Sequence, residues 1–143
     1  MKKSISLVVI ADIQIAKIFE KNGDKKFDLH LISTLEAELD SNHEKRDTSF
    51  GSASSPRHGV EPHTDRRLVE KHKFAEKISH SLEELEKAKA YDALILVTPH
   101  KMLEEIQETL GNPLKQKITH KLAKNLVQMS FAEIKEYLEE HLV

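Results

Sequence analysis

The sequence predicts a three-layer α/β domain, in which a mixed sheet has helices packed on its faces. Two observations carry this prediction. The first third of the chain reads as strands, with a short continuous apolar run, an extended pattern and then a segment that alternates with the period of two. The second half instead places short apolar runs between stretches of helical spacing, and this strand-helix-strand order implies parallel strands. The length of 143 residues fits a single domain over residues 1–143.

Three strands are predicted before residue 40. Residues 7–11 form a continuous apolar run, as expected of a strand that is covered on both faces. An extended pattern resumes over residues 13–19, and Asn22-Gly23-Asp24 predicts a turn because Asn and Gly tolerate positive φ. Alternation over residues 27–32 predicts the third strand. We therefore expect an antiparallel meander of local hairpins.

Residues 40–64 interrupt this pattern. These 25 residues hold three apolar members, together with five Ser, two Gly, two Pro and three His. Long irregular loops are uncommon in compact domains and are usually functional or disordered. Little apolar burial is available to offset the entropy of ordering, so we predict that this loop is the most mobile internal segment. A surface loop with no function is the alternative.

Helices and strands alternate after the loop. Thr64 is a candidate N-cap for a long helix that ends before residues 91–92, and a buried strand follows at residues 93–97. A second helix over residues 100–110 stops at Gly111-Asn112-Pro113, an edge strand lies near residues 118–124, and Ser130 caps a final helix. In that helix Phe131, Ile134, Leu138 and Leu142 are expected to face inward. The predicted core comprises Val8, Ile10, Leu29, Leu31, Phe74, Ile78, Leu82, Leu94, Leu96, Ile106, Ile134 and Leu138.

Composition narrows the classes of function. A formal net charge of -2 excludes a strongly basic nucleic-acid-binding protein but permits a local basic patch. Without Cys there is no disulfide, thiol nucleophile or Cys-ligated zinc. The longest apolar runs have five residues, far fewer than the roughly 20 of a membrane helix, and no cleavage site follows the apolar start. We expect a cytoplasmic protein, with neither DNA nor a membrane as its partner.

Five segments spread over nearly the whole chain follow one another in the order of a known family. They are Ala11-Asp12 through Ile18-Phe19-Glu20; Ser49-Phe50-Gly51-Ser52; Arg57-His58-Gly59-Val60-Glu61-Pro62-His63-Thr64-Asp65; Phe74-Ala75-Glu76-Lys77-Ile78; and Leu96-Val97-Thr98-Pro99. With these segments the sequence resembles the bacterial host attachment proteins, which are related to the middle domain of archaeal and eukaryotic class-one release factors. The resemblance implies a ribonuclease-H-like topology.

The same resemblance aligns residues 40–64 with the release-factor loop that enters the ribosomal peptidyl-transferase centre. In release factors this loop carries Gly-Gly-Gln before the long helix, but here Val60-Glu61-Pro62 follows the basic approach, and Gly-Gly-Gln occurs nowhere. Gly lets a backbone approach the tRNA closely, whereas Val and Pro restrict it and Glu61 repels phosphate. We therefore expect a protein that does not catalyse peptide release.

The candidate site for RNA or a protein partner combines the end of the loop with the start of the long helix. A helix N-terminus and guanidinium groups both favour anions, so phosphate binding there is physically reasonable. Interleaved acidic residues weaken the patch, and a solvated face of mixed charge is the alternative. The candidate residues are Arg57, His58, Glu61, Arg66, Arg67 and Lys71.

Catalytic hypotheses have less support. His58 and His63 are weak candidate metal ligands, because their spacing matches no zinc motif and solvated loop residues explain them as well. Asp12 follows a buried strand, as the catalytic carboxylate of ribonuclease-H-like nucleases does, although a turn residue is the alternative. Such nucleases need several converging carboxylates, for which Asp24, Asp28 and Asp92 are candidates by residue type alone. We expect no catalytic residue, no cofactor and no resident metal.

Three functions stay open at this point. The first is a non-enzymatic, release-factor-like protein that binds the translation machinery, such as the ribosome, or structured RNA. The second is a protein-interaction factor required for bacterial attachment to host cells, as the family description says. The third, a metal-dependent hydrolase or nuclease, has the least support.

Overall fold

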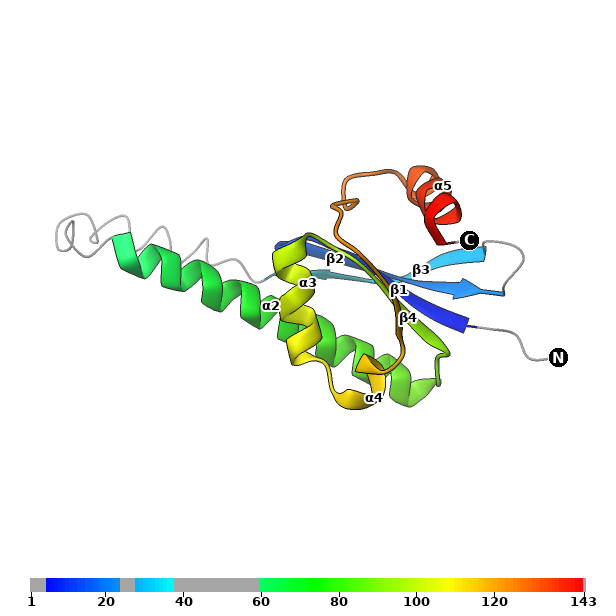
Figure 1. The fold of residues 1–143 in the computed structure, drawn as a ribbon, viewed down its shortest axis with the longest axis horizontal. Helices are drawn as coiled ribbons and strands as arrows, with labels where there is room; N and C mark the ends of the chain where they lie inside the picture. The colour runs from blue at the N-terminus through cyan, green and yellow to red at the C-terminus, as the bar shows by residue number, and fades with distance from the viewer. Residues whose placement is uncertain (1–4, 24–27, 38–59, 143) are drawn as a thin grey trace.

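The computed structural model describes residues 5–23, 28–37 and 60–142, and the side chains within these ranges except those of residues 60–68 and 142. Figure 1 shows one sheet with helices on both of its faces. The elements are β1 (Ile5–Ala11), β2 (Ile15–Asn22), β3 (Asp28–Glu36), α2 (Val60–Ala88), β4 (Ala93–Val97), α3 (His100–Thr109), α4 (Asn112–Lys115), β5 (Ile118–Leu122) and α5 (Phe131–Leu142).

The sheet is mixed and has five strands in the order β3-β2-β1-β4-β5. The first three strands form the expected antiparallel meander, in which β2 pairs with both β1 and β3. On its other side β1 pairs in parallel with β4, which in turn pairs in parallel with β5. This order and these directions are those of the ribonuclease-H-like topology that the family resemblance implies. The prediction of a three-layer α/β fold is confirmed.

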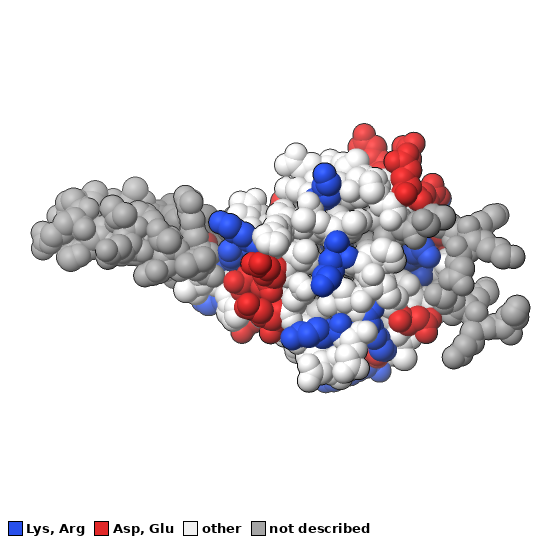
Figure 2. Space-filling view, in the orientation of Figure 1, with Lys and Arg blue, Asp and Glu red and all other residues white. Residues whose placement is uncertain are grey.

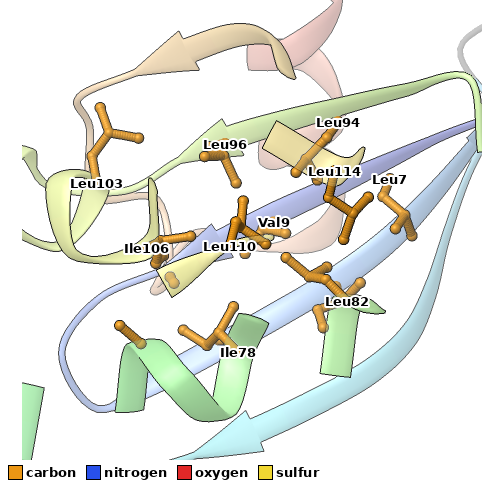
Figure 3. Close-up of a cluster of buried hydrophobic side chains, with 14 of the residues drawn as sticks. Leu7, Val9, Ile78, Leu82, Leu94, Leu96, Leu103, Ile106, Leu110 and Leu114 are labelled. Carbon is orange, nitrogen blue, oxygen red and sulfur yellow. The ribbon is translucent and has the colours of Figure 1, made fainter. Parts of the chain in front are cut away.

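The sheet separates two apolar clusters rather than enclosing one interior. Successive side chains of a strand point to opposite faces, so Leu7 and Val9 of β1 pack with α2 and α3, whereas Val8 and Ile10 pack with α5. Figure 3 shows side chains of the first cluster converging from the strands, α2, α3 and α4. Each face of β1 is therefore covered by its own helical layer.

All predicted core residues are buried except Leu31, which is 50% exposed. The prediction for Leu31 is wrong because β3 is an edge strand and contains a bulge. Phe19 faces Leu31 while Ile18 faces Ser33, so Ile32 is an extra residue that interrupts the alternation. The prediction that Phe131 faces inward also needs correction, since its side chain is 47% exposed. Its ring makes a tilted contact with the ring of Phe19, with centroids 6.1 Å apart.

The long helix begins earlier than the sequence predicts. It starts at Val60 instead of after Thr64, so the last five residues of the expected loop are helical. Pro62 is compatible with this start because a first-turn residue has no intrahelical partner for its missing N–H. The remainder of that loop, and its predicted mobility, fall on residues 40–59, which lie outside the described residues.

Other local predictions hold or need small corrections. At the start of α5 the Ser130 hydroxyl accepts a hydrogen bond from the Glu133 backbone N–H at 3.2 Å, and the Ser130 N–H donates to the Glu133 carboxylate at 2.9 Å. This reciprocal pair is a capping box, which confirms Ser130 as the N-cap. Gly23 has a φ of 79°, as the predicted turn requires. The predicted stop signal does end α3, but a further short helix, α4, begins at the same place with Pro113 in its first turn.

We predict that Leu96→Ala lowers the free energy of unfolding by about 2–5 kcal/mol, because Leu96 is fully buried in β4 and the change leaves a cavity. Leu31→Ala removes the same atoms from a half-exposed position and serves as the matched control, with an expected loss below about 1 kcal/mol. Equilibrium urea denaturation of both variants measures the difference. Equal losses at the two positions would contradict the assignment of β4 to the core.

Candidate functional site

The predicted binding residues lie just before α2 and within its first turns. Arg57 and His58 lie outside the described residues, whereas Glu61, Arg66 and Arg67 fall within the first eight residues of the helix. Lys71 is half-buried one turn later. The structure thus places part of the predicted set on regular helical backbone instead of a loop.

This part of α2 extends beyond the sheet. The helix has 29 residues, which corresponds to about 43 Å at 1.5 Å per residue. Its described side chains enter the core only from Phe74 onward, and Val69 is 50% exposed. Figure 1 shows the first turns of α2 running past the ends of the strands. We call residues 60–73 the α2 arm.

A row of polar contacts fixes the direction of α2. Four of its residues, separated by three, four or seven positions, share one helical face and contact α3 or the segment that follows it. Such contacts at several heights along a helix hold it in one orientation, so the arm has a defined direction relative to the sheet. The pairs are His72–Glu105 at 3.0 Å, Ser79–Thr109 at 2.5 Å, Glu83–Gly111 at 2.9 Å, and Glu86–Lys117.

The histidines near the arm do not meet as a metal site in the described part of the chain. His58 lies outside it, and the side chain of His63 is not among those described. The ring of His72 contacts two carboxylates instead, Glu105 at 3.0 Å through Nδ1 and Glu76 at 3.2 Å through Nε2. Among the described residues no group of three or more His, Cys, Asp or Glu could hold a metal ion.

The candidate nuclease carboxylates are dispersed. Oδ1 of Asp12 accepts hydrogen bonds of 2.8 Å from the backbone N–H groups of Gln14 and Ile15, which closes the turn between β1 and β2. Asp92 precedes β4 and accepts the Ile5 N–H at 2.8 Å. Because β1 and β4 are parallel, Asp12 and Asp92 lie at opposite ends of the sheet.

The remaining carboxylates do not restore such a site. Asp28 begins the edge strand β3 and contacts His30 at 2.9 Å, while Asp24 lies outside the described residues. A two-metal nuclease centre needs carboxylates that share the metal ions. The described carboxylates therefore form no such centre, and Asp12 has the geometry of a turn residue.

A partly buried polar contact ties β2 to the start of β4. The hydroxyl of Tyr91 donates a 2.5 Å hydrogen bond to Glu20, and Lys89 lies 3.2 Å from the same carboxylate. The Tyr91 hydrogen bond is the main cause that lowers the pKa of Glu20, with Lys89 contributing. Burial and the neighbouring Glu20 raise the pKa of Tyr91. The shifts of Glu20 and Tyr91 favour the ionised carboxylate and the neutral hydroxyl that this hydrogen bond requires.

A second basic surface, which the sequence motifs did not single out, lies at β5. Residues 109–132 contain four Lys and no Asp or Glu, a signal that is visible only when charges are counted along the chain. Lys115, Lys121 and Lys124 are exposed. Figure 2 shows Lys side chains over the part of the surface where Figure 1 places α4 and β5.

Comparison with known proteins identifies the family. Residues 7–138 match the family described as "Protein required for attachment to host cells". The chain belongs to this family. It is also 33% identical over 87 residues to an uncharacterized protein of Rickettsia prowazekii, a match that covers 59% of this chain and 58% of the relative. The chain thus matches less than two thirds of the relative's length.

A solved structure shows the same architecture at low sequence identity. An archaeal protein superposes over 96% of this chain and 34% of its own, with a TM-score of 0.53 and 16% identity. This likeness shows a shared fold. An archaeal translation termination factor matches over 96% of this chain and 41% of its own, with a TM-score of 0.46 and 15% identity. In the described part of this family member, no helix has the length and apolar character to span a membrane.

His72 gives the arm a measurable pH signature. Its pKa is raised above the ordinary value of 6.5, chiefly by the hydrogen bond with Glu105 and further by the charge of Glu76. A pKa that is higher in the folded than in the unfolded state stabilises the fold below pH 6.5, and this contribution is lost as the pH rises through the folded value. We predict that Glu105→Gln lowers the pKa of His72, measured by NMR titration of the ring.

The control for this titration is Glu84→Gln, because Glu84 lies 4.0 Å from His80 and makes no contact with His72. Like Glu105→Gln, this change removes one negative charge. Glu84 lies in α2 with Glu76 and His72, and its replacement leaves both His72 contacts in place. We expect the His72 pKa to be unchanged in this variant. A His72 pKa that is equally insensitive to Glu105→Gln would show that α2 and α3 are not joined there in solution.

Proposed function

We propose that the protein is a non-enzymatic binding protein of the translation machinery or of another structured RNA. The observation that supports this proposal best is the α2 arm, which carries Arg66, Arg67 and Lys71 beyond the sheet. Arginine forks and lysine ammonium groups bind phosphate, and such contacts supply much of the affinity for RNA. A projecting helix can reach a phosphate backbone without the rest of the domain approaching it.

Several observations favour binding over catalysis. The sequence has no Gly-Gly-Gln, and Val60-Glu61-Pro62 begins a regular helix at the corresponding place. A helical backbone that contains Pro cannot supply the flexible close approach that glycine permits. The described carboxylates are dispersed, as the Asp12 and Asp92 contacts show. Ribosome association without peptidyl-tRNA hydrolysis is thus the expected behaviour.

A second candidate function is a protein-interaction role in attachment to host cells, and the edge strand β3 favours it. This strand has nine residues without Lys or Pro, the residues that usually protect an edge from pairing. Its Leu31 and Ile32 are 50% and 37% exposed. Such an edge can accept an extended segment of another protein as an added strand. Protein capture that depends on β3 and is insensitive to RNA removal would favour this function.

We predict that the combined change Arg57→Gln, Arg66→Gln and Arg67→Gln weakens binding to a structured RNA. The slope of log K against log salt should fall by about 0.9 for each phosphate that the variant no longer neutralises, because fewer counterions are released. Fluorescence anisotropy over a salt series measures both the affinity and the slope. Sedimentation with ribosomes after salt washes tests the same dependence on the natural assembly.

A charge-matched variant controls for the removal of three positive charges. Lys77, Lys87 and Lys135 lie on the second half of α2 and on α5, away from the arm, and their change to Gln should leave the salt slope unchanged. Both triple variants should keep their helices, which circular dichroism measures. The proposal fails when the arginine variant remains with ribosomes as firmly as the wild type at every salt concentration. Hydrolysis of peptidyl-tRNA by the purified protein would contradict its non-enzymatic part.

A further inference from the structure

The outer edge of the sheet at β5 is basic. β5 pairs only with β4 in the strand order of the described sheet, so its other side is a free edge. Lys121 lies in this strand, Lys115 lies in α4 just before it, and Lys124 lies just after it. All three side chains are exposed, and His120 between them is half-buried. We call these four residues the β5 surface.

The charges of this surface are not neutralised by the described protein. Lys117 pairs with Glu86 and is therefore not counted among them. Lys121 contacts the neutral Gln107 at 3.4 Å, and no carboxylate in the described part of the chain pairs with Lys115 or Lys124. No acidic residue occurs between Glu108 and Glu133 in the sequence. A chain with an overall charge of -2 thus has a stretch, residues 109–132, whose charged members are all lysines.

We propose that the β5 surface is a second RNA-binding site, which contacts the phosphate backbone of double-stranded RNA. This inference rests on the proposed function, because it assigns the same class of partner to a surface separate from the α2 arm. Three ammonium groups on a short segment form a set of point charges that suits closely spaced phosphates. Lysine contacts of this kind position a nucleic acid without reading its bases.

The lack of stacking groups at this surface favours a duplex over a single strand. Single-strand-binding surfaces combine basic side chains with aromatic rings on which bases stack. Among the described Phe and Tyr side chains the exposed one is Phe131, which packs against Phe19 of β2. In the strand order, β2 is separated from β5 by β1 and β4. The half-buried His120 is the one aromatic ring within the β5 surface, so the contacts offered there to an RNA are mainly to its backbone.

The same surface is a poor match for a protein partner. Protein interfaces have an apolar centre and are depleted in Lys. The exposed large apolar side chains of the described chain are Ile13, Leu31, Ile32, Val69 and Phe131, and none of them belongs to α3, α4 or β5. A protein docked at β5 would have to bury lysines with no apolar anchor beside them. Polyanion binding avoids this cost because the lysines stay partly solvated.

Edge lysines have another established role, which the experiment must separate from RNA binding. Lys on an edge strand prevents the sheets of two molecules from pairing. If this were the whole role of Lys121 and its neighbours, their removal would cause self-association and leave RNA affinity unchanged. RNA affinity and oligomeric state therefore need to be measured on the same variants.

The test uses the variant Lys115→Gln, Lys121→Gln, Lys124→Gln and the control Lys77→Gln, Lys87→Gln, Lys135→Gln. The probes are a labelled RNA duplex of about 20 base pairs, longer than the roughly 16 that a double-stranded-RNA domain spans, and one of its single strands. We expect the β5 variant to bind the duplex on the order of 10- to 100-fold more weakly at about 0.1 M salt, with a salt slope lower by about 2.7. The control variant should bind as the wild type does.

Each other outcome overturns the proposal in a recognisable way. Equal duplex binding by the β5 variant and the control overturns it. If the duplex is bound more weakly only by the triple arginine variant of the α2 arm described above, this site is overturned but the proposed function stands. Self-association of the β5 variant with unchanged affinity assigns the lysines to edge protection instead. Tighter binding of the single strand than of the duplex overturns the choice of double-stranded RNA. A wild-type protein that binds neither RNA overturns this site, and sedimentation with ribosomes then decides the proposed function separately.

Discussion

The burial of β1 on both faces is the constraint on which the rest of the structure depends. Residues 7–11 are completely buried, so neither side of this strand can face water. A strand of this kind needs a partner strand on each edge and a helical layer on each face. β2 and β4 supply the edges, while α2 with α3, and separately α5, supply the two layers.

That central position also explains why the two proposed binding surfaces are peripheral. The inward side chains of β2 and β4, the strands next to β1, pack in the two apolar clusters. The polar contacts of Asp12, Glu20 and Asp92 stabilise turns and connections. Charged side chains without structural partners therefore gather on the outside of the layers and at their edges. The α2 arm and the β5 surface are two such places, one beyond the end of the strands and the other at a lateral edge.

Much of the fold follows from the sequence, because each element carries its own local signal. The apolar run of β1, the turn at Gly23 and the capping box at Ser130 are set by neighbours in the chain, and all three were predictable. The bulge at Ile32 was not predictable, because it depends on the register of β3 against β2. The early start of α2 was not predictable either, since Thr64 offers an attractive cap that the helix does not use.

The candidate site was predictable only in part, for a related reason. A dense cluster such as Arg66 and Arg67 is visible in the sequence, and its place at the start of the long helix follows from helical periodicity. The lysines of the β5 surface are spread over ten positions, from Lys115 to Lys124, and resemble ordinary solvated charges when read one by one. The edge position of β5 and the pairing of Lys117 with Glu86 show which of these lysines are available to bind an anion, and both are visible only in the structure.

The two lateral edges of the sheet differ, and this difference limits how copies of the protein can assemble. A filament of sheets needs two edges that can each accept a strand, so that growth continues in both directions. Here β3 is long and free of Lys and Pro, whereas β5 is short and bordered by lysines. Of the two edges, β3 is thus the less protected by lysine although it carries a bulge, and an assembly that used this edge alone would close after a single partner instead of propagating.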